Sequence, residues 1–433
     1  MKETLWIWGG TALVPGVGPG KIEDCAVGVT DGKITYVGTK QQAKPAADAR
    51  KLDASGCLVM PGLVNGHTHV GMSLFRGLGD DLPLEAWLRD VIFPKEQKWG
   101  SPEFVYWGSL LAFAEMIRGG ITSFNDMYYF EHESARASAE AGLRMVAGQS
   151  LTEESDIDQT GADITRAFDR FRELVSKYPL VTPALAPHAI YSVSRESWKK
   201  VVSYAKKNGV RMHFHLSEVA SENAYSQKEY GKTPTAFFEE IGVWDVPVTV
   251  AHAVCLTPED IGILGKHKVG AVYNAESNMK LATQIAPIVD LRRAGARIAL
   301  GTDSCASNNN LDILAEADFA AKLQAFKYGA GALKSEEVFQ LMTAEGAQAL
   351  GLGDATGSLE VGKAADVIAV EVTAPHAVPL YNPYSHLVYA ASGRDVRHTV
   401  VNGKVLMENR TLMTLDEQEI LREAASWARR IIA

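Results

Sequence analysis

The sequence predicts an α/β protein, a (β/α)8 TIM barrel with a small β-sandwich formed by the N- and C-terminal segments. Both chain ends are rich in β-branched and aromatic residues and contain hairpin turn signals. From Cys57 onward, short apolar runs alternate with helix-length amphipathic stretches, a pattern typical of βα units and a parallel sheet. A chain of 433 residues can supply eight such units and a smaller second domain.

The sandwich is predicted from segments at both ends of the chain. Thr4–Val14 and Cys25–Val37 are predicted strands, and Asp31-Gly32 is a hairpin turn signal. Gly357–Val372 and His398–Leu406 are predicted strands near the other end, the latter with an Asn402-Gly403 turn. We expect residues 1–57 to form the N-terminal half of the sandwich, residues 58–353 the barrel, and residues 354–433 the C-terminal half plus a C-terminal helix.

The barrel strands are predicted from apolar runs separated by helical stretches. These stretches include Glu103–Arg118, Arg195–Lys207 and Leu311–Tyr328, and another helix is expected over Ser335–Leu350. The predicted strands are Leu58–His67, Ile121–Met127, Arg144–Ser150, Thr182–His188, Arg211–Leu216, Pro247–Cys255, Gly270–Ala275 and Arg297–Asp303.

Composition excludes several classes of protein. A formal net charge of -9 argues against a nucleic-acid binder, since affinity for phosphate comes from clustered Lys and Arg. No run is long and apolar enough to predict a membrane span, and the first apolar stretch breaks at Gly9-Gly10, too early for a signal peptide. We therefore expect a cytoplasmic protein. The four cysteines form no Cys-x-x-Cys pair, which argues against a thiolate zinc site and against cytidine-type deaminase chemistry.

Histidines and an aspartate fall at the ends of several predicted strands. His67 and His69 end the first strand, His215 ends the fifth, and Asp303 ends the eighth. His252 lies in the sixth. Active sites of these barrels are built at the C-terminal ends of several strands, and imidazole and carboxylate are zinc ligands. The combination predicts a metal site.

Two further features refine this metal site. His213 shares a face with His215 but lies one layer deeper, and we interpret it as a core histidine with satisfied hydrogen bonds. The fourth predicted strand, Thr182–His188, contains no lysine that could bridge a second metal ion. One divalent metal ion per chain is therefore expected, with zinc favoured.

The same region contains candidate catalytic groups. Glu218 follows His215 by three residues and can turn back over the site as a general acid–base. Asp303 can bind the metal and accept a hydrogen bond from the nucleophilic water, whose pKa the metal lowers. His252 either orients the water and polarises the developing alkoxide or is an additional ligand.

These residues resemble the branch of the amidohydrolase superfamily that deaminates aromatic heterocycles, and more narrowly the 5-methylthioadenosine/S-adenosylhomocysteine deaminase family. The matching segments are distributed over nearly the whole chain and are specific in combination: PGLVNGHTHVGMSLFRGLGDDLPLEAWL, APHAIYS, HFHLSE, ESNMKLATQIAPI, GTDSCASNNNLD and NPYSHLVYAASG. The resemblance implies metal ligands His67, His69, His215 and Asp303, a proton shuttle at Glu218, and nucleoside contacts from Glu96 and His188.

The implied reaction is hydrolytic deamination of an adenosine-like nucleoside: 5′-methylthioadenosine, S-adenosylhomocysteine or adenosine. Guanine deamination and s-triazine dechlorination on the same scaffold are the enzymatic alternatives, and a catalytically dead barrel that binds a ligand is the alternative outside enzymes. The expected partner is a small-molecule nucleoside, with no nucleic acid and no membrane. A homo-oligomer is left open.

One departure from the family bears on the substrate. Some relatives carry arginines after the third strand, where they can hold the carboxylate of S-adenosylhomocysteine. Here Leu151–Asp158 reads LTEESDID, with four acids and no arginine. We expect a neutral 5′ group on the substrate, unless Arg166 or a neighbouring subunit supplies the missing cation.

Overall fold

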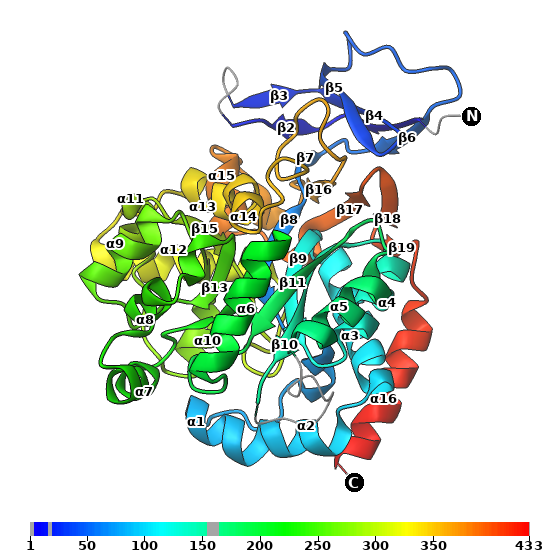
Figure 1. The fold of residues 1–433 in the computed structure, drawn as a ribbon. Helices are drawn as coiled ribbons and strands as arrows, with labels where there is room; N and C mark the ends of the chain where they lie inside the picture. Colours follow the sequence, from blue (N-terminus) through cyan, green and yellow to red (C-terminus); the bar gives the residue numbers. More distant parts are fainter. Residues whose placement is uncertain (1–3, 16–19, 154–163, 433) are drawn as a thin grey trace.

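Eight parallel strands form a barrel in a computed structural model that describes residues 4–15, 20–153 and 164–432. The strands neighbour one another in sequence order from β8 to β15, and helices surround them (Figure 1). The predicted fold class is thus confirmed. The barrel strands are β8 (Leu63–Thr68), β9 (Ile121–Tyr128), β10 (Arg144–Leu151), β11 (Val181–Pro187), β12 (Met212–Leu216), β13 (Val248–His252), β14 (Gly270–Tyr273) and β15 (Arg297–Leu300).

Helices connect these strands and begin where capping chemistry allows. At α9, Thr257 accepts a hydrogen bond from Asp260 N while the Asp260 carboxylate accepts one from Thr257 N, which is a capping box. The helices of the barrel are α3 (Pro102–Arg118), α4 (Glu131–Ala141), α5 (Ile164–Val175), α6 (Arg195–Asn208), α7 (Ala220–Tyr230), α8 (Pro234–Glu240), α9 (Pro258–Lys266), α10 (Ala275–Lys280), α11 (Ile288–Ala294), α12 (Ile313–Tyr328), α13 (Ser335–Met342) and α14 (Ala344–Ala349).

Hydrogen bonds between β8 and the residues that follow β15 close the barrel. Thr302 N donates to Asn65 Oδ1 at 3.0 Å, and Asn65 Nδ2 donates to Thr302 Oγ1 at 2.8 Å. One residue further, Asp303 N donates to His67 O at 3.0 Å. The first and last strands of the barrel are therefore joined at the position where both carry candidate site residues.

Two further sheets lie at one end of the barrel. The four-stranded sheet has the order β5-β4-β1-β6 and comes from the N-terminal segment, whereas the seven-stranded sheet, β19-β18-β17-β16-β7-β2-β3, combines both chain ends. Buried residues such as Ile7, Val27, Val59, Val367 and Val400 belong to one apolar cluster shared by the two sheets. The strands are β1 (Thr4–Trp8), β2 (Thr11–Leu13), β3 (Lys21–Glu23), β4 (Cys25–Thr30), β5 (Lys33–Thr39), β6 (Arg50–Asp53), β7 (Cys57–Pro61), β16 (Val367–Glu371), β17 (Val396–Val401), β18 (Lys404–Glu408) and β19 (Thr411–Leu412).

The predicted first strand, Leu58–His67, is wrong as a single barrel strand. Its first half is β7, which pairs with β16 and β2 in the seven-stranded sheet, and its second half is β8 of the barrel. The change occurs at Gly62, where a Cβ atom would lie 2.1 Å from the Thr122 side chain. Hydrophobic periodicity could not show this, because both halves are buried and apolar.

Two other predicted elements are shorter than expected. The helix predicted over Ser335–Leu350 is divided into α13 and α14 at Thr343, whose backbone leaves the helical region at φ -132° and ψ -100°. Of the predicted strand Gly357–Val372, only β16 is a strand. The residues before it form turns, and Ala364 N donates to Ala355 O.

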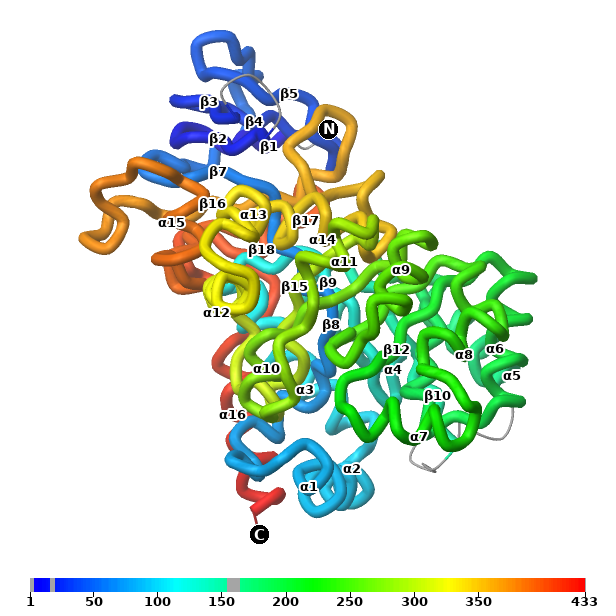
Figure 2. The backbone as a smooth tube through the Cα atoms, turned by 90° about the vertical axis from the view of Figure 1, so that its left-hand side faces the viewer, coloured from blue at the N-terminus to red at the C-terminus, as the bar shows by residue number. Residues whose placement is uncertain are grey.

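The long excursion between β8 and β9 covers the end of the barrel opposite the two smaller sheets. It contains η1 (Val70–Phe75), α1 (Leu84–Trp87), η2 (Leu88–Ile92) and α2 (Phe93–Trp99). Figures 1 and 2 show α1 and α2 at the bottom and the smaller sheets at the top. The remaining helices are α15 (Pro383–Tyr389) and α16 (Glu417–Ile432), and α16 packs against α3. Among the described helices, none combines the length and apolar character needed to cross a membrane.

Candidate active site

His67, His69 and Asp303 meet at the closing seam of the barrel. Nε2 of His67 and Nε2 of His69 each lie 3.4 Å from Asp303 Oδ1. The other carboxylate oxygen, Oδ2, accepts hydrogen bonds from Ser277 Oγ at 2.7 Å and Ser307 Oγ at 2.8 Å. These two hydroxyls fix the carboxylate so that Oδ1 faces the imidazoles.

His215 and His252 face the same point from the ends of β12 and β13. His215 Nε2 lies 3.3 Å from His69 Nε2. Candidate ligand atoms of His67, His215 and His252 lie within 4.8 Å of one another, as do those of His67, His69 and Asp303. His252 is fully buried and has a left-handed backbone, with φ +70°, that turns the chain out of its strand. The structure thus brings together all five residues singled out at the strand ends.

Burial keeps His67, His215 and His252 neutral at physiological pH. Desolvation lowers the pKa of His67 to about 4 and that of His252 to about 3, and it lowers the pKa of His215 well below the usual range. His69 Nδ1 lies 2.6 Å from Met127 O, and His215 Nδ1 lies 3.0 Å from His188 O. A carbonyl oxygen only accepts, so both imidazoles carry the proton on Nδ1 and direct the lone pair of Nε2 into the site.

Glu218 follows β12 and turns toward the same cluster. Ser217 has a φ of +48°, which reverses the chain, and Glu218 Oε2 lies 3.7 Å from His252 Nε2. The Glu218 amide donates to the carboxylate of Glu222 at 2.9 Å, which fixes the turn. Burial, together with the nearby Asp303 and Glu222, raises the pKa of Glu218 well above its usual range. A protonated carboxyl can therefore donate a proton inside the site.

Glu96 and His188 line the pocket above these groups. Glu96, on α2, is only 5% exposed and accepts a hydrogen bond from Tyr128 Oη at 2.8 Å. His188 Nδ1 lies 2.8 Å from Ser192 Oγ. Burial raises the pKa of Glu96 to about 7 and lowers that of His188 to about 4. The pocket therefore offers a carboxyl group and a neutral imidazole to a polar ligand.

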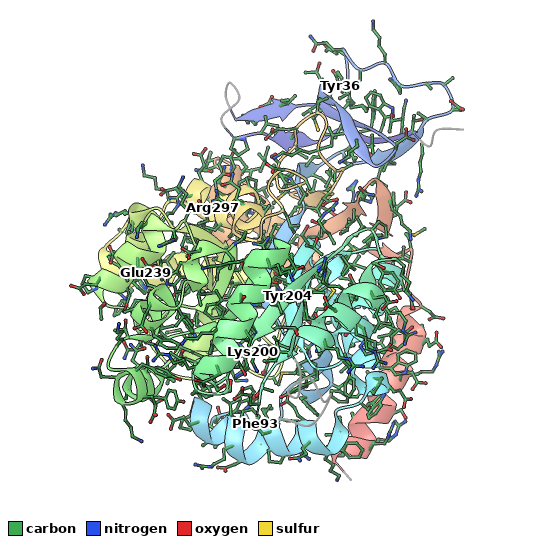
Figure 3. The ribbon with its side chains drawn as sticks, viewed as in Figure 1. Tyr36, Phe93, Lys200, Tyr204, Glu239 and Arg297 are labelled. Carbon is green, nitrogen blue, oxygen red and sulfur yellow. The ribbon has the colours of Figure 1, made fainter. Side chains whose placement is uncertain are left out.

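The remaining pocket wall is largely apolar. Figure 3 labels Phe93 on α2, at the end of the molecule opposite Tyr36 of the four-stranded sheet. A planar ring can be held between such side chains, with polar groups at one end to fix its orientation. The apolar and aromatic wall residues are Met72, Leu84, Trp87, Leu88, Ile92, Phe93, Met127, Tyr128, Tyr129, Tyr191 and Leu281.

The donor set fits a divalent metal ion such as zinc. His67 Nε2 is buried and makes no hydrogen bond with any residue that the structure describes. Close to this atom lie Asp303 Oδ1 and the other imidazoles that converge on the site. A buried, unpaired lone pair costs free energy unless a ligand satisfies it, and neutral imidazole with carboxylate is a zinc-binding set.

Several residues around the site were not singled out from the sequence. Two serines, Ser277 and Ser307, donate hydrogen bonds to Asp303. Glu222 accepts a hydrogen bond from the Glu218 amide. Asp126 Oδ1 accepts from Thr68 Oγ1 at 2.7 Å and from Val70 N at 2.8 Å, on either side of His69. Ser277 and Ser307 lie within segments that carry the family resemblance, but only the fold shows which acid they contact.

Comparisons with known proteins agree with this geometry. The model of the amidohydrolase family matches residues 58–406. A 5-methylthioadenosine/S-adenosylhomocysteine deaminase of Syntrophobacter fumaroxidans is 44% identical, over 94% of this chain and 93% of the relative. A 5′-deoxyadenosine deaminase of Methanosarcina acetivorans is 41% identical, over 96% and 95%. The crystal structure of an adenosine deaminase from Xanthomonas campestris with bound zinc has a TM-score of 0.93 and 36% identity, covering 99% of this chain and 98% of that one.

The raised pKa of Glu96 predicts a pH-dependent effect on stability. The folded protein binds the Glu96 proton more tightly than the unfolded chain does, so this group destabilises the fold as pH rises from 4.5 to about 7. Glu96→Gln keeps an acceptor for Tyr128 and removes the charge. We expect the variant to be more stable than the parent at pH 8, by up to about 3 kcal/mol, and little changed at pH 5.

Denaturant unfolding at the two pH values, with metal present throughout, measures this difference. Glu173→Gln is the control, because Glu173 is exposed on α5 and its substitution should give no such pH dependence. An equal change for Glu96→Gln at pH 5 and pH 8 would contradict the assignment of a buried, proton-binding carboxyl.

Proposed function

Because the chain belongs to the amidohydrolase family, we propose that it deaminates an adenosine-like nucleoside by hydrolysis. Water replaces the exocyclic amino group, and the products are the corresponding inosine analogue and ammonia. Two of the relatives described above are named as deaminases of 5′-modified adenosines, and the Xanthomonas campestris structure as an adenosine deaminase.

The observation that carries this proposal is the convergence of unprotonated Nε2 atoms on a carboxylate beneath an apolar pocket. His67, His69, His215 and Asp303 would hold one divalent ion, with zinc favoured. When bound, such an ion supplies Lewis acidity that makes water nucleophilic at neutral pH. Asp303 accepts a hydrogen bond from the attacking water through the carboxylate that Ser277 and Ser307 orient.

Glu218 moves the proton. Its carboxylate takes a proton from the attacking water, a step that its raised pKa favours, and then delivers that proton to the ring nitrogen beside the amino-bearing carbon. Protonation of this nitrogen draws electrons out of the ring and lets the carbon become tetrahedral. Glu218 then moves the remaining proton of the added hydroxyl to the amino group, the carbon–nitrogen bond breaks, ammonia leaves and the ring regains its conjugation.

His252 acts as a hydrogen-bond donor rather than as a fifth ligand in this proposal. Asn278 Nδ2 lies 3.0 Å from His252 Nδ1, and an amide nitrogen is a donor. The neutral imidazole then carries its proton on Nε2, the atom that faces Glu218. A proton there can stabilise negative charge on the oxygen that adds to the ring.

Glu96 and His188 would bind the ribose, and the apolar wall would hold the purine. As a carboxylate, Glu96 can accept hydrogen bonds from two neighbouring hydroxyls, and Tyr128 fixes its position. Guanine, a free base, would not use these groups, and an s-triazine would not either. This distinguishes the proposal from the two alternative ring substrates.

A panel of substrates tests the proposal. Ammonia release should be measured with 5′-methylthioadenosine, 5′-deoxyadenosine, adenosine and guanine, and chloride release with a chlorinated s-triazine. We expect ammonia from the adenosines and little turnover of guanine or the triazine. A metal-loaded protein that binds nucleosides without a single turnover would instead indicate a catalytically dead barrel.

Glu218→Gln should retain the metal and lose most of its activity. The amide cannot carry a proton, and general acid–base groups typically contribute about 10²- to 10⁴-fold to rate. Glu222→Gln is the matched control, since it keeps an acceptor for the Glu218 amide and should lose far less. Metal content and kcat are measured for both variants, and near-normal turnover by Glu218→Gln would remove it from the mechanism.

One divalent ion per chain is expected. β11 and the residue after it supply no lysine and no acid to hold a second ion. Elemental analysis of the active protein should give about one metal per chain, most of it zinc. His215→Ala or Asp303→Ala should lower both metal content and rate. Two ions per active chain would contradict the proposed ligand set.

The substrate should carry a neutral 5′ group. The described residues that line the pocket include no Lys and no Arg. Glu153 accepts hydrogen bonds from the backbone and side chain of Ser194, at the start of α6, and Glu154–Asp158 lie outside the described residues. An amino-acid carboxylate in this pocket would therefore lack a charge-assisted partner among the described residues.

We expect kcat/KM for 5′-methylthioadenosine to exceed that for S-adenosylhomocysteine by roughly ten- to a hundredfold, from the loss of one charged hydrogen bond. Both values of kcat/KM are measured at matched ionic strength, and the ratio between them is compared. Arg89 lines a neighbouring pocket but pairs with Asp90, so Arg89→Ala should leave the ratio unchanged. A preference for S-adenosylhomocysteine that Arg89→Ala abolishes would contradict the prediction and identify Arg89 as a residue that binds the substrate carboxylate.

A further inference from the structure

Each of the three histidines proposed as metal ligands has a partner behind its ring. For His69 and His215 the partner is a backbone carbonyl, as described above, and a carbonyl fixes the proton on Nδ1. His67 differs from them. Its Nδ1 lies 2.8 Å from Nε2 of His213, an imidazole that can either donate or accept at this atom. The protonation of His67 therefore depends on a second side chain.

The far side of His213 resolves this choice. His213 Nδ1 lies 3.0 Å from the backbone oxygen of Thr249, on the neighbouring strand β13. Because this oxygen only accepts, His213 carries its proton on Nδ1 and presents a lone pair at Nε2. His67 must then donate from Nδ1, which leaves the lone pair of His67 Nε2 directed at Asp303.

The opposite tautomer of His213 would disable His67 as a ligand. A proton on His213 Nε2 would face His67 Nδ1, so His67 would have to carry its own proton on Nε2, where a metal needs a lone pair. It would also place a lone pair of His213 against the Thr249 carbonyl. Both rings are almost completely enclosed, with His213 1% and His67 0% exposed, so water cannot rescue the mismatch.

We propose that His213 is a positioning residue that fixes the tautomer and ring orientation of His67 through a relay ending at the Thr249 carbonyl. The inference rests on the proposed metal site and adds a residue to it. His213 has both ring nitrogens paired, as a core histidine would, but one of its partners is a proposed ligand. Partners of this kind typically contribute about 10- to 100-fold to metal affinity or activity.

Three variants separate this role from a merely structural one. His213→Phe keeps a ring of similar size but leaves the His67 Nδ1 proton without an acceptor. His213→Gln can restore an acceptor, since its side-chain oxygen reaches about as far as Nε2. His398→Phe is the control, because His398 is also buried and paired at both nitrogens, with Asp53 O and Asn409 N, but lies in the seven-stranded sheet.

The full chain of each variant is prepared without metal, and its zinc affinity is measured by competition with a chromophoric chelator. The visible absorption of the cobalt-substituted protein reports ligand geometry, and kcat is measured at saturating zinc. We expect about 10- to 100-fold weaker zinc binding and an altered cobalt spectrum for His213→Phe. His213→Gln should recover most of the affinity and the parental spectrum, and His398→Phe should change thermal stability alone.

Two results would overturn the relay. One is a folded His213→Phe variant with parental zinc affinity and cobalt spectrum. The other is a His213→Gln variant that loses as much zinc affinity as His213→Phe does. If His213→Phe does not fold, a loss of zinc affinity of about 10- to 100-fold in His213→Gln would overturn the relay in the same way. Failure of the parent protein to bind zinc or cobalt would instead contradict the proposed function, so the two failures are distinguishable.

Discussion

The hydrogen-bonded seam between β8 and β15 is the constraint on which both the fold and the site depend. Asp303 N donates to His67 O, so one of the bonds that close the barrel also places a carboxylate beside an imidazole. The approach is close: a Cβ atom at Gly301 would lie 2.6 Å from the Val272 side chain and 2.8 Å from His67 N. The contacts that close the barrel therefore also bring two candidate metal ligands together.

Burial sets the charge state of the site before any substrate arrives. It disfavours the charged forms of His67, Glu218 and Glu96, so this imidazole stays neutral and the two acids bind protons more tightly than they would in water. Hydrogen bonds then select the tautomers, because carbonyl oxygens behind the rings only accept. A site arranged in this way needs little reorganisation when charge develops on the substrate.

The sequence placed the candidate site residues at predicted strand ends, but it did not reveal the residues that support them. Candidate residues were identifiable because they end predicted strands. The bounds of β9 and β10 differ from prediction by one residue each, and every residue of both strands is buried. Glu96 required the family resemblance, because it lies on a helix of the long excursion, where no periodicity places it at the pocket. The contact between His67 and His213 joins residues 146 positions apart, so local patterns contain no signal for it.

The two smaller sheets hold the starts of two barrel strands, β8 and β10. β7 leads into β8 at Gly62, whose amide donates to Asp366 O just before β16. The Asp366 carboxylate accepts from Arg144 at the start of β10 and from Asn402 N in the turn after β17. Because this carboxylate is fully buried, its pairing with Arg144 is required for the fold to tolerate it. The first residues of β8 and β10 thus contact segments from the C-terminal part of the chain. The register of β8, which carries His67, therefore depends on residues more than 300 positions away, as the pairing of Pro61 with Val367 illustrates.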